Sequence, residues 1–217
     1  MHYKNIKTMK ALVFDVETTG LPTKWNPPVN ESNWWPYIVQ ISWMIYNIDE
    51  NKEVLTKDKI IKLENGMEIP EESTKIHGIT NEIMNEKGVH IKNVLGDFIN
   101  ALKTTDVAIA HNLKFDKSMV LVESNRNNLD INFDKREFCT MLYGEKLCGL
   151  TRVNKYGRMV SKYPKLIELH NKLFCYEPTN LHNSLYDVAV CLRCYVKMRF
   201  NKDLLDANEK MKSLTCF

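Results

Sequence analysis

The order in which apolar patterns follow one another along the chain limits the fold more than any other feature. Residues 11–14 form a continuously apolar run that leads to Asp15, which is typical of a buried strand. Between residues 38 and 46 the apolar residues recur with a period of two, which predicts a second strand. Part of 54–63 is predicted to form a third, after the turn at 49–51. Three consecutive strands predict an antiparallel meander.

Helical spacing takes over in the second half of the chain. Apolar residues in 91–102 share one face at a period of 3.6, and 107–110 predict a short buried strand before a helix at 117–124. Residues 138–142 predict a last strand, Pro164 suits the first position of a helix, and 185–200 predict a final helix. The pattern predicts an α/β fold with a mixed sheet, in one domain over 1–217 with its core at about 11–200.

Composition and charge exclude several classes of protein. No apolar run approaches the ~20 residues of a membrane span, and the run after the basic residues 1–10 is too short for a signal-peptide core. Six cysteines without such a signal indicate reduced thiols, so we expect a cytoplasmic protein without a membrane partner. Cys191 and Cys194 fall within a helical pattern and are interpreted as core cysteines, not zinc ligands. The net charge of +3 permits a polyanionic partner.

The first candidate site is the segment Phe-Asp-Val-Glu-Thr-Thr-Gly at 14–20. Asp15 ends a buried strand, where a carboxylate is costly unless it is paired or bound to a metal. Glu17 stands two residues later, so both side chains point to the same side of an extended chain. Two such carboxylates repel each other, and a divalent cation relieves the repulsion. The alternative is a strand end whose acids cap a neighbouring helix.

The second candidate site is Ala-His-Asn-Leu-Lys-Phe-Asp at 110–116. It follows an apolar strand, at the edge where an α/β sheet presents functional side chains. Taken alone, Asp116 is better explained as the N-cap of a helix beginning at Lys117, and His111 as a hydrogen-bonded structural histidine.

The third candidate site is Leu-His-Asn-Ser-Leu-Tyr-Asp at 181–187. Ser184 and Asp187 match a capping box, which is the structural alternative. The functional interpretation places Asp187 in the first turn of the last helix, where the helix dipole favours an anion. His182 then lies in the preceding loop, with a side-chain pKa suited to a general base near neutral pH.

Taken together, the three segments are far more specific than any one of them. Asp-x-Glu-Thr-x-Gly after the first strand, Asn-x-x-Phe-Asp in mid-chain and His-x4-Asp at the last helix closely resemble the DEDD exonuclease superfamily. These DnaQ-like 3′→5′ exonucleases have a ribonuclease H-like fold, so the resemblance implies a five-stranded mixed sheet flanked by helices. It extends over about residues 11–196. Asn183 replaces the tyrosine of one subclass, and His182 marks the histidine subclass, DEDDh.

The resemblance also implies a cofactor and a mechanism. Two Mg²⁺ ions, replaceable by Mn²⁺, would be bridged by Asp15, with Glu17 and Asp187 completing one site and Asp116 helping to hold the ions. Such ions lie ~3.5–4 Å apart and serve to activate a water and to stabilise the leaving 3′ oxygen. Oxygen ligands suit these cations better than they suit zinc. His182 would take the proton from the attacking water.

Further motifs resemble the substrate-binding parts of the family, including Ile-His-Gly-Ile-Thr at 76–80 and the segment at 164–169. Lys114 and Lys117 stand near the second motif, where they would meet phosphates or remain solvated. For Phe115 a core position is an equal alternative to base stacking. The residues implied to bind the terminal nucleotides are Thr18, Thr19, Gly20, Leu21, His77, Ile79, Asn112 and Phe115.

The expected activity is the release of nucleoside monophosphates from 3′ ends of single-stranded DNA, in proofreading, repair or degradation. DNA is favoured because 18–21 and 77–80 resemble the DNA-directed branch. An RNA-trimming enzyme like RNase T or oligoribonuclease is the alternative, since a contact with the 2′-OH cannot be identified from the sequence. A non-catalytic nucleic-acid-binding module is disfavoured, because all four acids and the histidine are present. A homodimer and association with a polymerase stay open.

The segment 24–36 departs from the family pattern by lengthening the first connection. It carries Trp25, Trp34 and Trp35, which would either stack on substrate, bind a partner or fold back onto the sheet. We favour the structural interpretation.

Overall fold

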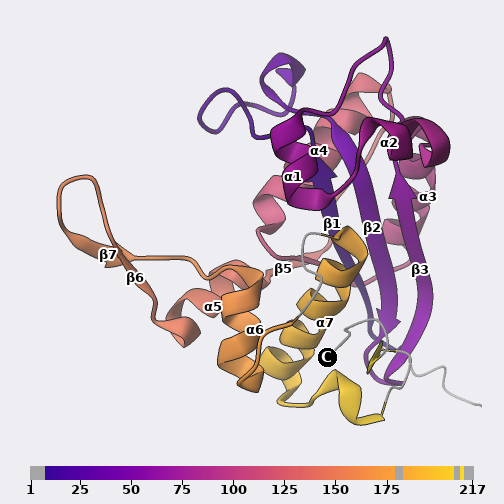
Figure 1. Cartoon of the computed structure of the whole chain (residues 1–217). Coiled ribbons are helices and arrows are strands. Elements are labelled where there is room, and N and C mark those ends of the chain that lie inside the picture. Colours follow the sequence, from indigo (N-terminus) through magenta and orange to yellow (C-terminus); the bar gives the residue numbers. More distant parts are fainter. Residues whose placement is uncertain (1–7, 179–182, 208–210, 213–217) are drawn as a thin grey trace, which may run out of the picture.

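A mixed five-stranded sheet lies at the centre of the computed structural model, which describes residues 8–178, 183–207 and 211–212 (Figure 1). The strand order is β3-β2-β1-β4-β5. β1–β2 and β2–β3 pair antiparallel, whereas β1–β4 and β4–β5 pair parallel. The predicted mixed sheet, an antiparallel meander followed by parallel strands, is confirmed. The strands are β1 (Lys10–Thr18), β2 (Ile38–Asn47), β3 (Lys52–Ile60), β4 (Val107–Ala110) and β5 (Arg136–Cys139).

In the described part of the chain, seven α-helices surround this sheet, and none of them is long and apolar enough to cross a membrane. Two 3₁₀ turns, η1 (Ser32–Trp34) and η2 (Leu204–Ala207), and a separate hairpin of β6 (Thr151–Val153) and β7 (Met159–Ser161) complete the fold. The helices are α1 (Glu71–His77), α2 (Asn81–Lys87), α3 (Ile91–Lys103), α4 (Leu113–Arg126), α5 (Thr140–Cys148), α6 (Leu166–Phe174) and α7 (Ser184–Phe200).

Apolar layers cover both faces of the sheet, and β1 contributes to each. Leu12 and Phe14 face the cluster formed with α3 and α4, whereas Ala11 and Val13 face the cluster formed with α7. Side chains alternate along a strand, so the next odd-numbered positions also point to the α7 side. All ten residues of β2 are buried, because helices cover it from both sides. The core therefore directs Asp15 and Glu17 toward α7.

Several predicted boundaries differ from the structure. The strand predicted at 138–142 is wrong beyond Cys139, where α5 begins, because a short apolar run does not distinguish strand from helix. The helix predicted at 117–124 begins four residues earlier, at Leu113. Pro164 precedes α6 and is not its first residue; the helix start is stabilised by the Lys165 N–H, which donates to Glu168 Oε2 at 2.7 Å. α1, α2 and the β6–β7 hairpin were not predicted.

Candidate active site

A hydrogen bond links the start of α7 to the end of β1. The Ser184 hydroxyl donates a 2.8 Å hydrogen bond to the backbone oxygen of Asp15. Asn183 caps the helix, since its side-chain oxygen accepts from the Leu185 N–H at 3.2 Å. The capping-box interpretation of Ser184 is therefore wrong: this serine already lies inside the helix and connects it to the strand.

Three carboxylates meet at this junction. One oxygen from each of Asp15, Glu17 and Asp187 lies within 4.8 Å of the other two. Asp187 stands in the first turn of α7, as predicted, at the positive end of the helix dipole. A set of oxygen donors this close together suits a hard divalent cation.

Asp116 reaches the same region from α4. Because Asn112 is the N-cap of this helix, in a left-handed conformation with φ of 75°, Asp116 lies in its first turn. The interpretation of Asp116 as an N-cap is therefore wrong. Its side chain is only 3% exposed, and it forms a hydrogen bond with the Val16 backbone beside Asp15. Asp116 is not one of the three closest carboxylates, but the charge of Asp15 acts on it.

Burial makes these carboxyl groups hard to ionise without a cation. Burial raises the pKa of Asp15 to about 7, although the hydrogen bond with Ser184 opposes the shift. Burial, and then the charges of Asp15 and Asp187, raise the pKa of Glu17 to about 9. The pKa of Asp116 is also raised well above its usual value, first by burial and then by Asp15.

Two carboxylate oxygens at the junction also lack a hydrogen-bond partner. Oδ2 of Asp15 and Oδ2 of Asp116 are buried, and no partner is found for either in the part of the chain that is described. An unsatisfied buried oxygen is costly, and a bound cation would satisfy it. The residues present therefore fit a divalent metal site.

The predicted general base, His182, lies outside the described residues. The next residue, Asn183, is described and caps α7 beside the carboxylates. The other histidine of the motifs, His111, is structural, as predicted. It is half-buried between the Thr140 hydroxyl at 2.9 Å and the Pro164 carbonyl at 3.1 Å, and desolvation lowers its pKa to about 4.

An ordered turn follows β1 where substrate contacts were predicted. The Thr18 hydroxyl donates to the Gly20 oxygen at 2.7 Å, and Thr19 exchanges hydrogen bonds with the Tyr37 backbone. Gly20 has a φ of 148°, which L side chains rarely adopt, so glycine is required here. Leu21 is exposed beyond the turn. The turn presents backbone groups and one apolar side chain next to Glu17.

The predicted turn at 76–80 is confirmed as the connection between α1 and α2. Gly78 is left-handed at φ of 75°, and the Ile79 N–H donates to His77 Nδ1 at 3.1 Å. A hydrogen bond with the Thr18 backbone brings His77 to the end of β1, while burial lowers its pKa. Ile79 differs from the expectation, because it is only 6% exposed and packs in a separate core cluster with Val39.

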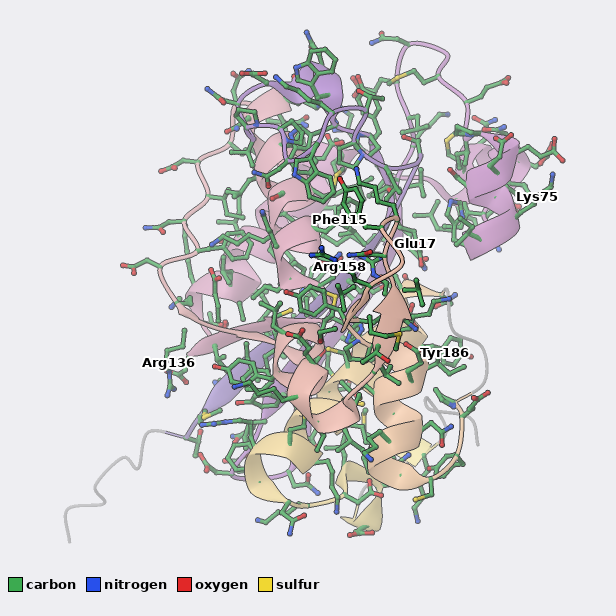
Figure 2. The ribbon with its side chains drawn as sticks, turned by 90° about the vertical axis from the view of Figure 1, so that its left-hand side faces the viewer. Glu17, Lys75, Phe115, Arg136, Arg158 and Tyr186 are labelled. Carbon is green, nitrogen blue, oxygen red and sulfur yellow. The ribbon has the colours of Figure 1, made fainter. Side chains whose placement is uncertain are left out.

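Phe115 is half-buried against the core and lines an apolar cleft of about 200 Å³. Trp25 forms another wall of this cleft and is 96% exposed. Figure 2 shows Phe115 and Glu17 on the same side of the molecule. The N-cap residue Asn112 lines the cleft as well, so the cleft adjoins the start of the helix that carries Asp116.

The tryptophans of segment 24–36 have different environments. Trp35 is buried, and its Nε1 donates to the Pro28 carbonyl at 3.1 Å, so the structural interpretation holds for it. Trp34 is half-exposed; its Nε1 donates a hydrogen bond to Glu31, and the Lys24 ammonium lies over its ring. Trp25 alone of the three stands almost fully in solvent.

Two lysines near the second motif have partners of their own. The Lys114 ammonium lies 2.5 Å from Asn26 Oδ1, and the Lys117 ammonium lies 2.5 Å from Glu137 Oε1. Lys117 is therefore partly neutralised, whereas Lys114 keeps its charge at the wall of the cleft.

A polar network beneath the site was not predicted from the sequence. The Ser184 N–H donates to Gln40 Oε1 at 3.4 Å, and both Gln40 Nε2 and Ser42 Oγ donate to Asp58 Oδ1 at 2.8 Å. Its signal was present, since Gln40 and Ser42 are polar residues inside an otherwise apolar strand. We infer that this network fixes the start of α7, and with it Asp187.

The chain is similar to known exonucleases in sequence and in fold. The chain matches the RNase_T exonuclease family over residues 12–195. It is similar to the DNA polymerase III epsilon subunits of two Buchnera aphidicola strains. The subunit from subsp. Schizaphis graminum is 28% identical over 211 residues, covering 95% of this chain and 81% of that protein. The subunit from subsp. Acyrthosiphon pisum is 24% identical over 200 residues, covering 90% of this chain and 75% of that protein.

Solved structures of exonuclease I share the fold. The zinc-bound E. coli exonuclease I complex with single-stranded DNA superimposes with a TM-score of 0.64 at 17% identity, over 89% of this chain and 41% of that one. The complex of E. coli exonuclease I with a dT13 oligonucleotide superimposes with a TM-score of 0.63 at 18% identity, and the match covers 88% of this chain and 41% of that one. The chain thus spans about two fifths of exonuclease I. Because its family match covers most of the sequence, the chain belongs to the exonuclease family, as a DnaQ-like exonuclease of the ribonuclease H-like superfamily.

Proposed function

We propose that this exonuclease releases nucleoside monophosphates from the 3′ ends of single-stranded DNA. The observation that carries the proposal is the cluster of Asp15, Glu17 and Asp187, with Asp116 buried beside it. Four acids from β1, α4 and α7 converge at one end of the sheet, in the order that the exonuclease motifs require.

We infer that the acids hold two divalent cations, Mg²⁺ with Mn²⁺ as a substitute. Asp15 would contact both ions, Glu17 and Asp187 would complete one site, and Asp116 would help to hold the pair. When bound, the ions supply positive charge that activates a water and stabilises the leaving 3′ oxygen. This ligand set is supported by the buried Oδ2 atoms of Asp15 and Asp116, for which the described residues offer no hydrogen-bond partner.

The chain's own residues would do the rest of the chemistry. We infer that His182 accepts the proton of the attacking water at a ring nitrogen, the role of a general base with a pKa near neutral. The turn at 18–21 would bind the terminal nucleotide through its backbone, since Gly20 allows close approach. Leu21 would wedge against the last base, and His77 would border the same nucleotide. Ile79, being buried, would act through the packing of this turn.

We infer that a nucleobase upstream of the terminal nucleotide stacks in the cleft between Trp25 and Phe115. Aromatic side chains bind the faces of single-stranded bases with little sequence preference. Asn112 and Lys114 line the same cleft and would contact the sugar-phosphate backbone. The exposure of Trp25 supports this role, because a large apolar side chain left in solvent is available for a ligand.

The names of similar proteins support DNA as substrate. The relatives are DNA polymerase III epsilon subunits, and exonuclease I is described in complexes with single-stranded DNA. RNA is the second candidate, because the family that the chain matches carries the name RNase_T. Digestion of labelled DNA and RNA oligonucleotides of one sequence, side by side, distinguishes the two by their initial rates.

Asparagine substitution of the carboxylates tests the proposed catalytic site. Asp15→Asn and Asp187→Asn keep the side-chain volume but remove the charge that holds a cation. We expect each to lower the rate of nucleotide release by more than about 100-fold, since losing only an outer-shell partner of a metal costs 10–100-fold. The matched control is Asp97→Asn on the exposed surface of α3, which should retain full activity. Full activity in either site variant would refute the assignment.

A further inference from the structure

The β6–β7 hairpin projects from the body of the protein beyond α5 (Figure 1). All three residues of β6 are exposed, and in β7 only Val160 is partly covered. The turn at 154–158 is well formed, because Asn154 Oδ1 accepts from the N–H groups of Tyr156 at 2.9 Å and Arg158 at 3.0 Å. A two-stranded hairpin is marginally stable alone and adds little to the core. Its side chains are therefore directed at solvent or at a partner.

The charge of this hairpin and its flanks has a single sign. Residues 150–166 contain five cations and no acid, so the remainder of this +3 chain carries a net −2. Lys162 is paired with Glu168 at 2.5 Å. In the described ranges, no carboxylate forms an ion pair with the three cations nearest the tip, Arg152, Lys155 and Arg158. A hairpin that only needed to be soluble would carry both signs.

Aromatic and apolar side chains lie among these cations. Tyr156 at the tip is 74% exposed, and Met159 is 64% exposed. The Lys155 ammonium lies 5.0 Å from the centre of the Tyr156 ring. Basic side chains interleaved with exposed aromatic ones suit a nucleic acid strand, whose phosphates need cations and whose bases stack on rings.

The base of the hairpin is connected to the active site. The carbonyl of Pro164, just after β7, accepts a hydrogen bond from His111 Nε2 at 3.1 Å. His111 belongs to the segment that leads to Asp116. On the other side, the Ser161 hydroxyl donates to Glu145 Oε1 of α5 at 2.6 Å. These two hydrogen bonds attach the base of the hairpin to the segment that leads to Asp116 and to α5.

The two views place the hairpin in front of the site. Figure 1 shows it displaced to the left of the body, and Figure 2, seen from that side, shows Arg158 overlapping the region of Glu17 and Phe115. The hairpin is thus displaced from the site mainly along the line of sight of Figure 2. We propose that it is an arm that binds the phosphate backbone of the strand whose 3′ end occupies the active site. This inference rests on the proposed function.

The test compares a long and a minimal substrate in the variant Arg152→Ala/Lys155→Ala/Arg158→Ala. Binding of a fluorescent 20-nucleotide single-stranded DNA is measured by anisotropy in EDTA, over a range of salt concentrations. We expect the variant to bind about tenfold more weakly at 0.1 M salt, with the slope of log K against log salt reduced by about 2. Hydrolysis of the p-nitrophenyl ester of thymidine 5′-phosphate, which is too small to reach the arm, should be unchanged.

The matched control is Lys92→Ala/Lys103→Ala, which removes exposed cations from α3 on the opposite side of the molecule (Figure 1). This control should bind the oligonucleotide like the wild type, and thermal melting confirms that both variants are folded. Equal affinity and equal salt slope in the arm variant would overturn the inference, as would wild-type protein that does not bind the oligonucleotide at all. Failure of the wild type to hydrolyse the small ester with Mg²⁺ or Mn²⁺ would instead refute the proposed function.

Discussion

The carboxyl groups of Asp15 and Glu17 lie next to each other in partly buried positions, and this placement has a cost that depends on pH. Their folded-state pKa values are about 7 and about 9, above the usual 3.8 and 4.5. A group with a raised folded-state pKa contributes stability below its unfolded pKa and loses it as pH rises through the folded value. These two groups should therefore lower the stability of the metal-free protein progressively between about pH 4 and pH 9.

The prediction is a falling melting temperature in EDTA as pH is raised from 6.5 to 9; at lower pH His111, whose pKa is lowered to about 4, adds stability as pH rises and opposes the fall. Added Mg²⁺ should raise the melting temperature most at the high end, because the cation binds the ionised carboxylates. Asp15→Asn removes one of the titrating groups, so this variant should show a shallower fall and a smaller response to Mg²⁺. A melting temperature that rises between pH 6.5 and pH 9 in EDTA, or one that Mg²⁺ leaves unchanged at pH 8, would contradict the account.

Trp25 gives a second prediction at the scale of a residue. If its ring stacks on a nucleobase, Trp25→Ala should weaken single-stranded DNA binding by about 1–3 kcal/mol, the range for loss of one base–aromatic stack. Trp34→Ala is the matched control, because Trp34 is held by Glu31 and Lys24 and does not line the cleft. Fluorescence anisotropy measures both. Equal affinity in the two variants would rule out the stacking role of Trp25.

Among the elements, the segment after β1 is held to α4 by Arg126. Its guanidinium donates to the carbonyls of Pro36, Ser32 and Trp35 at 2.7–2.8 Å and to Glu123 at 2.8 Å. It also stacks on the ring of Tyr37 at 3.9 Å. One side chain thus satisfies three backbone oxygens of a segment that has little regular structure of its own.

Arg126→Ala should lower the free energy of unfolding by about 3 kcal/mol. The reason is that it leaves Glu123 buried without its cation, and breaking a buried ion pair from one side costs 3–5 kcal/mol. Arg126→Lys keeps the charge but loses the planar guanidinium, so its free energy of unfolding should lie between those of the wild type and Arg126→Ala. Urea denaturation measures both variants, and wild-type stability in Arg126→Ala would refute this role.

The elements with strong periodicity were predictable from the sequence, and the others were not. β2, α3 and α7 have long apolar stripes, and their predicted ends agree with the structure within a residue or two. α1 and α2 have seven residues each, too few for a stripe to emerge. α4 begins early because Asn112 takes a left-handed conformation, which a hydrophobic pattern does not reveal. The hairpin buries no apolar face, so no pattern marks it.

The site was predictable in its acids but not in its supports. The period of two in β1 placed Asp15 and Glu17 on one side, and the helical pattern placed Asp187 in the first turn of α7. The caps were assigned wrongly, because short polar residues at a helix start have several equivalent roles in sequence. Only the structure shows that Asn112 and Asn183 are the N-caps of α4 and α7. Asp116 and Asp187 are therefore not needed as caps, and their carboxylates are available to the site.

Across the whole molecule, charge is segregated more than the net value of +3 suggests. Acids gather at the end of β1, whereas residues 150–166, in and beside the hairpin, contain five cations and no acid, and one of these cations, Lys162, is paired with Glu168. A strand with its 3′ end at the acids would have its upstream phosphates near the arm. The arm would thus increase the affinity for the strand by binding its upstream phosphates, whereas the cation site would cleave its 3′ end.

The central claim is that the chain removes nucleotides from 3′ ends with the help of a divalent cation. The most direct measurement compares a linear single-stranded DNA with a circular one of the same sequence, with Mg²⁺ and with EDTA. The account predicts mononucleotides from the linear DNA with Mg²⁺, no products from the circle, and no reaction in EDTA. Cleavage of the circle, or undiminished release in EDTA, would contradict it.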